Sequence, residues 1–271
     1  MNKLLTFFAA PVTAFFYKPV YQEAAKSRAS RGVLYSLYLA GLSVVLIMMV
    51  LSAKVMPLAN AFAGWVETNL PVMIWTPGGL SLENGQTTAT LEHPEYGTIA
   101  LFDMTKTTAS EADMGDAYLL VTSQKAYIKK APGQIEVRDL TGAGMRSGQQ
   151  MPPRVRIDGA IVAKLYQNLK NVMKFVLPFL VLIFSFAGFL VVNLFYSLAG
   201  LLFNKIRVEK LAYGAIFNLA CFATSAAFTL NWLRVFITMP AFLPPFVLNL
   251  LVTLFYLYFS FKVTDRKPET V

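Results

Sequence analysis

The sequence predicts an α-helical membrane protein with four transmembrane helices and a small β-rich extracytoplasmic domain inserted between helix 1 and helix 2. Four apolar runs, at 33–52, 175–203, 211–230 and 241–261, contain no Lys, Arg, Asp or Glu. Each reaches the length of about 20 residues that a helix needs to cross a bilayer, and the second is longer than one crossing needs. A more polar stretch, 53–174, separates the first run from the second.

Composition supports lipid as the main surroundings of this chain. Hydrophobic residues make up 56% of it and charged residues only 14%, against about 25% charged residues in an average soluble domain. The net charge of +9 is concentrated beside the apolar runs, where it indicates topology. We therefore predict a lipid bilayer as partner and no nucleic acid.

The basic residues near the runs predict the orientation of the four helices. One face has ten Lys and Arg residues close to the spans and the other has five, and the richer face is expected in the cytoplasm. Both termini are then cytoplasmic. The ten residues are Lys18, Lys26, Arg28, Arg31, Lys205, Arg207, Lys210, Lys262, Arg266 and Lys267, and the five are Lys54, Lys164, Lys170, Lys174 and Arg234.

These arguments divide the chain into ten segments. A cytoplasmic amphipathic or interfacial segment (1–32) precedes transmembrane helix 1 (33–52), the extracytoplasmic β-rich domain (53–157), a juxtamembrane helix (158–174), transmembrane helix 2 (175–203), a cytoplasmic loop (204–210), transmembrane helix 3 (211–230), an extracytoplasmic loop (231–240), transmembrane helix 4 (241–261) and a cytoplasmic tail (262–271). A competing interpretation treats the first run as a cleaved signal peptide with a small-x-small site at 59–61. The 32 residues before the run favour a retained anchor.

The amphipathic segment 3–21 has two interpretations that do not exclude each other. Its aromatic and apolar residues could lie in the inner leaflet, or they could pack against the transmembrane bundle. Pro11 and Pro19 are predicted to break the helix.

Short runs rich in Thr, Ile, Val and Tyr alternate with turn residues in the polar stretch, which predicts a mostly antiparallel β domain. The expected strands are 72–75, 79–82, 87–91, 98–103, 118–122, 126–130 and 135–139. The segment 141–153 is predicted to be a linker. After it, Asp158 is expected to cap a helix that continues into the second span, with a possible kink at Pro178.

Small residues are dense in the third apolar run, from Gly214 to Ala227, which predicts a helix at the centre of the bundle. The polar groups within the last three runs are Asn193, Asn218 and Asn249. They could line a polar crevice, but hydrogen bonds between helices are the favoured interpretation. Cys221 is expected to serve packing, and the absence of ionisable residues from the runs argues against proton-coupled transport.

The polar stretch offers few candidates for chemistry. His93, between Glu92 and Glu95, is interpreted as part of a solvated turn because the neighbouring proline disfavours zinc geometry. Asp103, Asp113 and Asp116 could act as an acid–base pair, although nothing in the sequence brings them together. Phosphate-loop, metalloprotease, nucleophile-elbow and paired-cysteine motifs are absent. We therefore predict no enzyme activity, with no catalytic, cofactor-binding or metal-binding residues and no cofactor.

The order of these elements resembles a known family. A basic aromatic N-terminal segment (15–31), one anchor helix, a Gly-x-Leu strand (79–82), an Ile-x-x-Phe-Asp-x-Thr strand end (99–105) and a three-helix C-terminal bundle are similar to the bacterial DUF1189 membrane proteins, over nearly the whole chain. Met104 separates the Asp–Thr pair of that family. The resemblance implies a bacterial plasma (inner) membrane location and a bundle distantly similar to the Yip1 type. It implies no reaction.

The sequence therefore predicts a binding, scaffold or envelope-sensing protein that acts through its extracytoplasmic domain. The expected partner is another membrane or envelope protein, and a homo-oligomer is possible. The alternative is a transporter, or a transporter subunit, for a neutral or amphiphilic solute.

Overall fold

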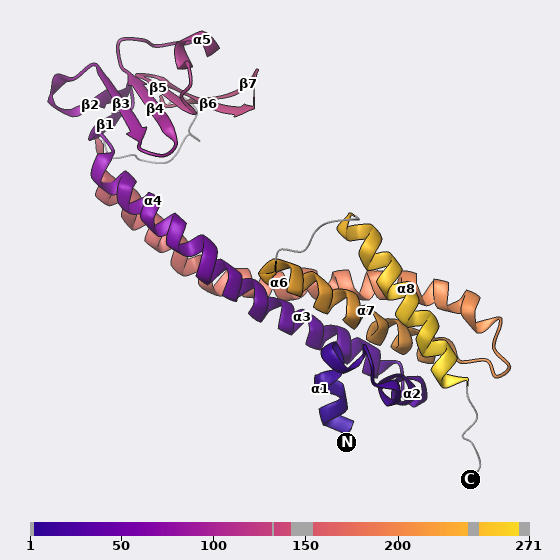
Figure 1. The fold of residues 1–271 in the computed structure, drawn as a ribbon. Coiled ribbons are helices and arrows are strands. Elements are labelled where there is room, and N and C mark those ends of the chain that lie inside the picture. The colour runs from indigo at the N-terminus through magenta and orange to yellow at the C-terminus, as the bar shows by residue number, and fades with distance from the viewer. Residues whose placement is uncertain (1–2, 132, 142–153, 238–243, 266–271) are drawn as a thin grey trace. The chain divides into compact units, whose positions relative to one another are not determined.

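The computed structural model describes residues 3–131, 133–141, 154–237 and 244–265 (Figure 1). The chain forms two compact units. The helical unit comprises residues 1–52 and 174–271, and the sheet unit comprises residues 53–173. Two helices contribute to both units, and we describe each unit separately.

The helical unit contains α1 (Lys3–Thr13), α2 (Lys18–Lys26), α3 (Ser30–Val50), the second part of α6 (Gly159–Asn204), α7 (Tyr213–Phe236) and α8 (Pro245–Thr264). Within the described residues, four helices are long and apolar enough to cross a membrane: 30–69, 159–204, 213–236 and 245–264. This finding fits a membrane protein. The prediction of four long apolar helices with a separate β region is confirmed.

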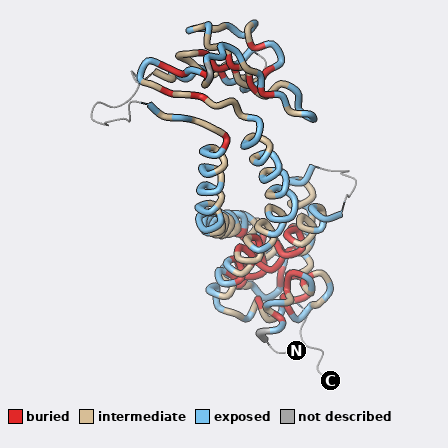
Figure 2. Tube along the Cα trace, turned by 90° about the vertical axis from the view of Figure 1, so that its left-hand side faces the viewer, coloured by how far each residue is buried: buried red, intermediate tan, exposed pale blue. Residues whose placement is uncertain are grey.

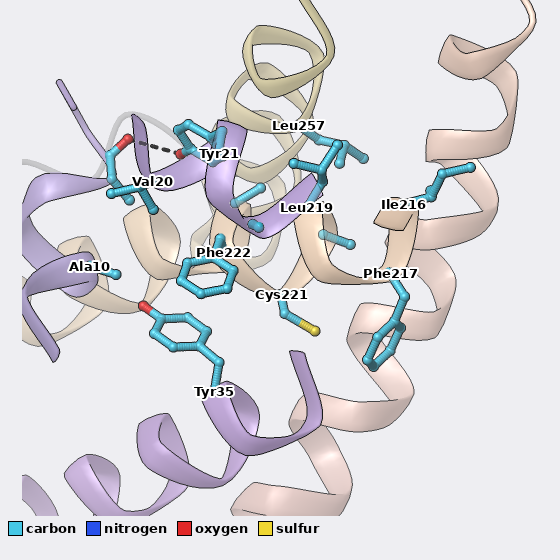
Figure 3. Packing of buried hydrophobic residues seen from close by; sticks show 14 of the residues in the cluster. Ala10, Val20, Tyr21, Tyr35, Ile216, Phe217, Leu219, Cys221, Phe222 and Leu257 are labelled. Atoms are coloured by element: carbon cyan, nitrogen blue, oxygen red, sulfur yellow. Dashed lines mark hydrogen bonds between the residues drawn. The ribbon is translucent and has the colours of Figure 1, made fainter. Parts of the chain in front are cut away.

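Helix α7 lies at the centre of the helical unit, as its small residues predicted. In its most apolar stretch 78% of residues are buried, against 28% for the α3 and α8 stretches and none for α6. The Tyr35 ring of α3 stacks on the Phe222 ring of α7 with 4.0 Å between centroids (Figure 3). At the start of α7, Gly214 allows a close approach to the residue before α3, because a Cβ there would lie 3.1 Å from the Ala29 side chain.

Helices α1 and α2 bury one face against the bundle and expose the other. Ala10, Ala14, Val20, Tyr21 and Ala24 join the hydrophobic core, which is drawn as buried in Figure 2. The Tyr21 hydroxyl donates to the Ala14 carbonyl (2.9 Å). On the outer face Leu5, Phe8, Val12 and Phe16 remain exposed, so packing against the bundle leaves an apolar face for a bilayer surface.

Prolines have smaller effects on the helices than predicted. The expected break at Pro11 is wrong: this residue lies within α1, whose last turn loses one hydrogen bond before the helix ends at Thr13. Pro19 lies in the first turn of α2, where its missing N–H costs little. Pro178 lies within the unbroken α6.

Two helices extend beyond the predicted spans. After α3 the backbone makes one π-helical turn, Leu51–Val55, and continues as α4 (Met56–Asn69). Pro57 follows this turn and cannot donate a helical hydrogen bond, which favours the local widening. Helix α7 continues to Phe236, into the loop predicted at 231–240, and residues 238–243 lie outside the described part of the chain.

The sheet unit contains two sheets, and its short helix α5 (Glu111–Met114) lies in the connection between β4 and β5. The strands are β1 (Met73–Thr76), β2 (Gly79–Leu82), β3 (Thr88–His93), β4 (Gly97–Asp103), β5 (Leu119–Thr122), β6 (Lys125–Ala131), β7 (Gln134–Asp139) and β8 (Val155–Ile157). One sheet has the order β2-β1-β8 and the other β3-β4-β5-β6-β7. All pairs are antiparallel except β4 with β5, which are parallel.

The seven predicted strands are confirmed to within two residues, and the prediction missed β8. That strand has only three residues and pairs with β1 across a long sequence separation, so no local pattern distinguishes it. Most of the predicted linker 141–153 lies outside the described residues.

The two sheets share a core and meet at a glycine. Met73, Trp75, Leu80, Leu91 and Phe102 belong to one buried cluster. Gly79 has φ +132°, and a Cβ there would lie 2.2 Å from the Ser123 carbonyl oxygen. This close approach lets the Leu80 N–H donate to that oxygen (2.6 Å), which joins β2 to the β5–β6 turn.

Helix α4 and the first part of α6 lie side by side within the sheet unit (Figure 1). The Asn60 side-chain oxygen accepts hydrogen bonds from the Tyr166 hydroxyl (2.9 Å) and the Lys170 ammonium (2.8 Å). Gly159 lies against the α4 backbone, because a Cβ there would be 2.0 Å from the Glu67 oxygen. The predicted Asp158 cap of α6 is confirmed by a bond from the Ile161 N–H (3.0 Å).

Candidate functional site

Asn218 of α7 connects three helices from a fully buried position. Its side-chain oxygen accepts the Gly32 N–H of α3 (2.8 Å). Its amide nitrogen donates to the carbonyls of Ala24, Ser27 and Arg28, at 3.0 to 3.1 Å. Since the last carbonyls of a helix lack partners within it, Asn218 satisfies the end of α2 and fixes its approach to α3.

Asn193 is also fully buried and connects α6 to α3 and α7. Its nitrogen donates to the Ser36 hydroxyl of α3 (3.1 Å), and its oxygen accepts the Thr224 hydroxyl of α7 (3.0 Å). The Ser36 hydroxyl also approaches the Cys221 sulfur at 3.6 Å. For Asn193 and Asn218, the interpretation as interhelical hydrogen bonding is confirmed, and Cys221 packs in the core.

Asn249 of α8 behaves differently, because it lines a cavity between α6, α7 and α8. The cavity has a volume of about 460 Å³. Within the described residues, the buried side-chain oxygens of Asn249 and Thr253 have no hydrogen-bond partner. The two residues are one turn apart on the same face of α8. The crevice interpretation therefore applies to this asparagine alone.

The walls of the cavity are mainly apolar and uncharged. Phe189, Val192 and Phe228 line it, and among the residues that the structure describes no Lys, Arg, Asp, Glu or His does. Two of its hydroxyls already have backbone partners: Ser43 donates to the Leu39 carbonyl (2.9 Å) and Thr224 to the Cys221 carbonyl (2.8 Å). Ser185, Tyr196, Asn231 and Trp232 add polar groups from α6 and α7, but the buried oxygens without a partner in the described structure are the two on α8.

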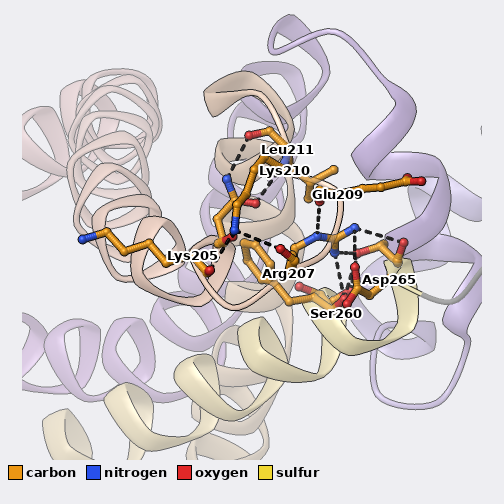
Figure 4. Close-up of polar contacts among 10 residues, drawn as sticks. Lys205, Arg207, Glu209, Lys210, Leu211, Ser260 and Asp265 are labelled. Atoms are coloured by element: carbon orange, nitrogen blue, oxygen red, sulfur yellow. Dashed lines mark hydrogen bonds and ion pairs between the residues drawn. The ribbon is translucent and has the colours of Figure 1, made fainter.

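Arg207, in the loop between α6 and α7, caps the end of α8 (Figure 4). Its guanidinium donates to the Phe261 carbonyl (2.9 Å) and to the hydroxyl of Thr264 (2.6 Å), and lies 3.5 Å from the Asp265 carboxylate. The neighbouring groove of about 700 Å³ also contains Lys210. Lys210 donates to the carbonyl of the last residue of α6 and to two carbonyls of the loop that follows, so both cations serve the protein's own backbone at helix ends.

The sheet unit brings together two of the three aspartates that the sequence singled out. The Lys106 ammonium lies 2.6 Å from the Asp113 carboxylate and 3.7 Å from that of Asp103. A hydrogen bond from Lys106 lowers the pKa of Asp113, and a hydrogen bond from the Thr105 hydroxyl lowers the pKa of Asp103. Both carboxylates therefore favour the ionised form. This suits ion pairs that hold a turn in place better than it suits a general acid. Asp116 makes no ion pair with Lys106 within the described residues.

His93 lies among aromatic rings of the sheet unit. Its ring centroid is 4.6 Å from that of Trp65, 4.7 Å from that of Tyr96 and 6.1 Å from that of Phe62. The prediction of a solvated turn missed these contacts. In the part of the chain that the structure describes, no group of three or more His, Cys, Asp or Glu side chains is placed to hold a metal ion.

The Asp103–Thr105 strand end and the three-helix bundle correspond to a family match over residues 8–261. The chain belongs to the DUF1189 family, which is described as a protein family of unknown function. A comparison with curated proteins and another with solved structures each found no match.

In this DUF1189 protein, the sequence pattern did not indicate the cavity or the role of Arg207. Asn249 was identified from the sequence as a polar group, but Thr253 was overlooked. Because it follows Asn249 by four residues, the two together indicate a polar face on α8. Arg207 resembled the other basic residues of the loop between α6 and α7, although it is almost completely buried.

Proposed function

We propose that this DUF1189 protein is a binding or scaffold protein of the bacterial plasma membrane. In this proposal both termini are cytoplasmic, and the sheet unit lies outside and binds another membrane or envelope protein. The helical unit anchors it. The observation that carries the proposal is an unpartnered apolar face on the α4–α6 pair of the sheet unit.

We define the paired-helix face as Leu58 and Phe62 of α4 with Leu165, Leu169 and Val172 of α6, all exposed. On each helix these residues are three or four positions apart and form a stripe along the helix. Viewed from the N-terminus of its own helix, each stripe is displaced in the same rotational direction from the face that packs on the other helix. Because the two helices are antiparallel, both stripes then lie on one side of the pair. Exposed apolar residues arranged in this way mark interaction surfaces more often than isolated ones do.

The aromatic group around His93 supports the same surface. Phe62 belongs both to this group and to the paired-helix face, and Tyr96 is more than half exposed. Aromatic side chains are enriched in protein interfaces because they bury a large area at a low entropic cost. Burial of this surface by a partner would remove apolar area from water.

A photocrosslinking amino acid tests this proposal in intact membranes. We expect a discrete adduct from position Leu165 and none from Gln167, which is exposed on the opposite side of α6. The double variant L58D/F62D should remove the adduct. An adduct of twice the chain mass would identify a second copy as the partner. Equal adducts from both positions, or no change with L58D/F62D, would contradict the proposal.

The orientation is tested with single cysteines in a C221S background. A membrane-impermeant maleimide should label Gln134→Cys from outside the cell and Glu209→Cys only after lysis. The reverse pattern would overturn the orientation.

The second candidate function is transport of a neutral or amphiphilic solute, which the uncharged cavity favours. Solute flux into liposomes that contain the purified protein would support it. The absence of flux with the protein folded and inserted would leave the binding role as the better account.

A further inference from the structure

The α8 face of the cavity in the helical unit has the properties of a ligand site. Thr253 is 1% exposed, and its hydroxyl and the Asn249 oxygen lack partners within the described residues. Buried polar groups are nearly always hydrogen-bonded, and a membrane interior supplies no water as a substitute. Two such orphans, one turn apart and facing the same cavity, indicate a hydrogen-bonding ligand.

The chemistry of the two side chains restricts that ligand. The Asn249 oxygen can only accept a hydrogen bond, and the Thr253 hydroxyl can donate or accept. A hydroxyl on the ligand can satisfy both, since it donates to one and accepts from the other. A charged head group is disfavoured, because none of the described residues that line the cavity carries a charge.

The dimensions of the cavity fit one hydrocarbon chain. Its volume of 460 Å³ falls in the range of about 300–1,000 Å³ typical of ligand pockets. It extends along α6 from Ser185 to Tyr196, which corresponds to about 16 Å of helix. Half of a bilayer core is about 15 Å thick, so the cavity matches a chain from one leaflet.

We propose that this cavity binds a neutral lipid with a long hydrocarbon chain and a hydroxyl head group, whose hydroxyl bonds to Asn249 and Thr253. The chain lies against Phe189, Val192 and Phe228. This site is independent of the proposed binding role, because it lies entirely within the helical unit and uses no residue of the paired-helix face. It is the same cavity that favours transport as the second candidate function.

The test uses the full chain in phosphatidylcholine nanodiscs and a photoactivatable monoacylglycerol as probe. Monooleoylglycerol should compete with labelling, whereas methyl oleate, which lacks a hydroxyl, and lysophosphatidylcholine, whose head group is zwitterionic, should compete at least about tenfold more weakly. N249L and T253V should each weaken binding about tenfold. S260A serves as the matched control on α8, because the Ser260 hydroxyl bonds to the Leu257 carbonyl and lies outside the cavity.

A second pair of variants tests the cavity without removing any polar group. A Cβ at Gly188, which lines the cavity, would meet nothing within 4 Å, and the same holds at Gly41 of α3, which does not line it. G188F should therefore abolish labelling and G41F should leave it unchanged. Both variants should elute from a sizing column as the wild type does, which shows that loss of binding is not loss of folding.

Four results would overturn the proposal. Equal competition by methyl oleate, or unchanged binding in both N249L and T253V, would remove the role of the hydroxyl. Undiminished labelling of G188F would place the probe elsewhere. A crosslink from position 188 to a second copy of the chain would identify a protein helix, and not a lipid, as the occupant. If the photocrosslinking from the paired-helix face failed, the interpretation of these lipid-binding results would not change.

Discussion

The helical unit and the sheet unit use polar groups in opposite ways. In the helical unit Asn193 and Asn218 are fully buried, and each connects separate helices. In the sheet unit the ion pair of Lys106 with Asp113 has side chains 42% and 30% exposed. Water can replace a lost bond at the surface but not in the core. The same chemical change should therefore cost much more in the helical unit.

The largest effect is expected for N218L. Leucine has a similar size but cannot bond to the Gly32 N–H or to the carbonyls of Ala24, Ser27 and Arg28. The Gly32 N–H and the Ala24 and Arg28 carbonyls each keep one backbone partner, but four hydrogen bonds are lost together. At about 1 kcal/mol for each bond, we expect a loss of about 3 kcal/mol or more in the free energy of unfolding. Thermal unfolding of the purified protein in detergent measures this change.

The matched control is N249L, which changes the same residue type in the same unit. Because the Asn249 oxygen has no partner in the described structure, its removal in lipid-free detergent should leave stability unchanged or slightly raised. Equal losses in the two variants would mean that helix packing depends on amide volume and not on the bonds of Asn218.

The next effect in size is expected for G79A in the sheet unit. The new Cβ would have to avoid the Ser123 oxygen from a backbone with φ +132°, so β2 should separate from the β5–β6 turn. We expect a loss of about 2–3 kcal/mol. Hydrogen exchange of the Leu80 amide, measured by mass spectrometry, should become faster.

Gly85 provides the control for this change, because it also has a positive φ, +69°, but a Cβ there would meet nothing within 4 Å. G85A should cost only about 1–2 kcal/mol and leave the Leu80 amide protected. If both variants exposed the Leu80 amide equally, backbone strain at the substituted glycine would explain the effect, and not the close approach of Gly79 to Ser123.

The two units also differ in how well their structure follows from sequence. Apolar runs and strand patterns predicted four long helices and seven strands, because each depends on local periodicity. Strand β8 and the parallel pairing of β4 with β5 depend on contacts between distant residues, which no local pattern contains.

The candidate sites show the same limit. The sequence identified Asn193, Asn218 and Asn249 as polar groups among apolar runs, but only the arrangement of the helices separates two bonded amides from one that faces a cavity. The link between Asp103 and Asp113 runs through Lys106, whose position depends on the turn after β4. Side-chain type predicted candidates, and tertiary packing decided their roles.

Replacement of Arg207 tests whether this charge contributes to stability as a buried polar group does or as a surface charge does. Lysine in R207K keeps the charge but cannot reach the Phe261 carbonyl, the Thr264 hydroxyl and the Glu209 carbonyl together. We expect a loss of about 1–2 kcal/mol in thermal unfolding. K205A, which removes an exposed cation from the same loop, should have no effect. Equal stability of R207K and the wild type would place Arg207 with the surface charges.

The smallest effect is expected for D113N in the sheet unit. The hydrogen bond from Lys106 lowers the pKa of Asp113 below its usual value of 3.8. A carboxylate with a lowered pKa stabilises the folded state above that usual value, and the contribution is lost as the pH falls through the folded pKa. Hydrogen exchange around α5 should therefore accelerate in acid in the wild type and depend less on pH in D113N. D116N is the control, since Asp116 lies outside this ion pair. Because the pair is exposed and screened, a large effect of D113N would show that the sheet unit also relies on single polar contacts.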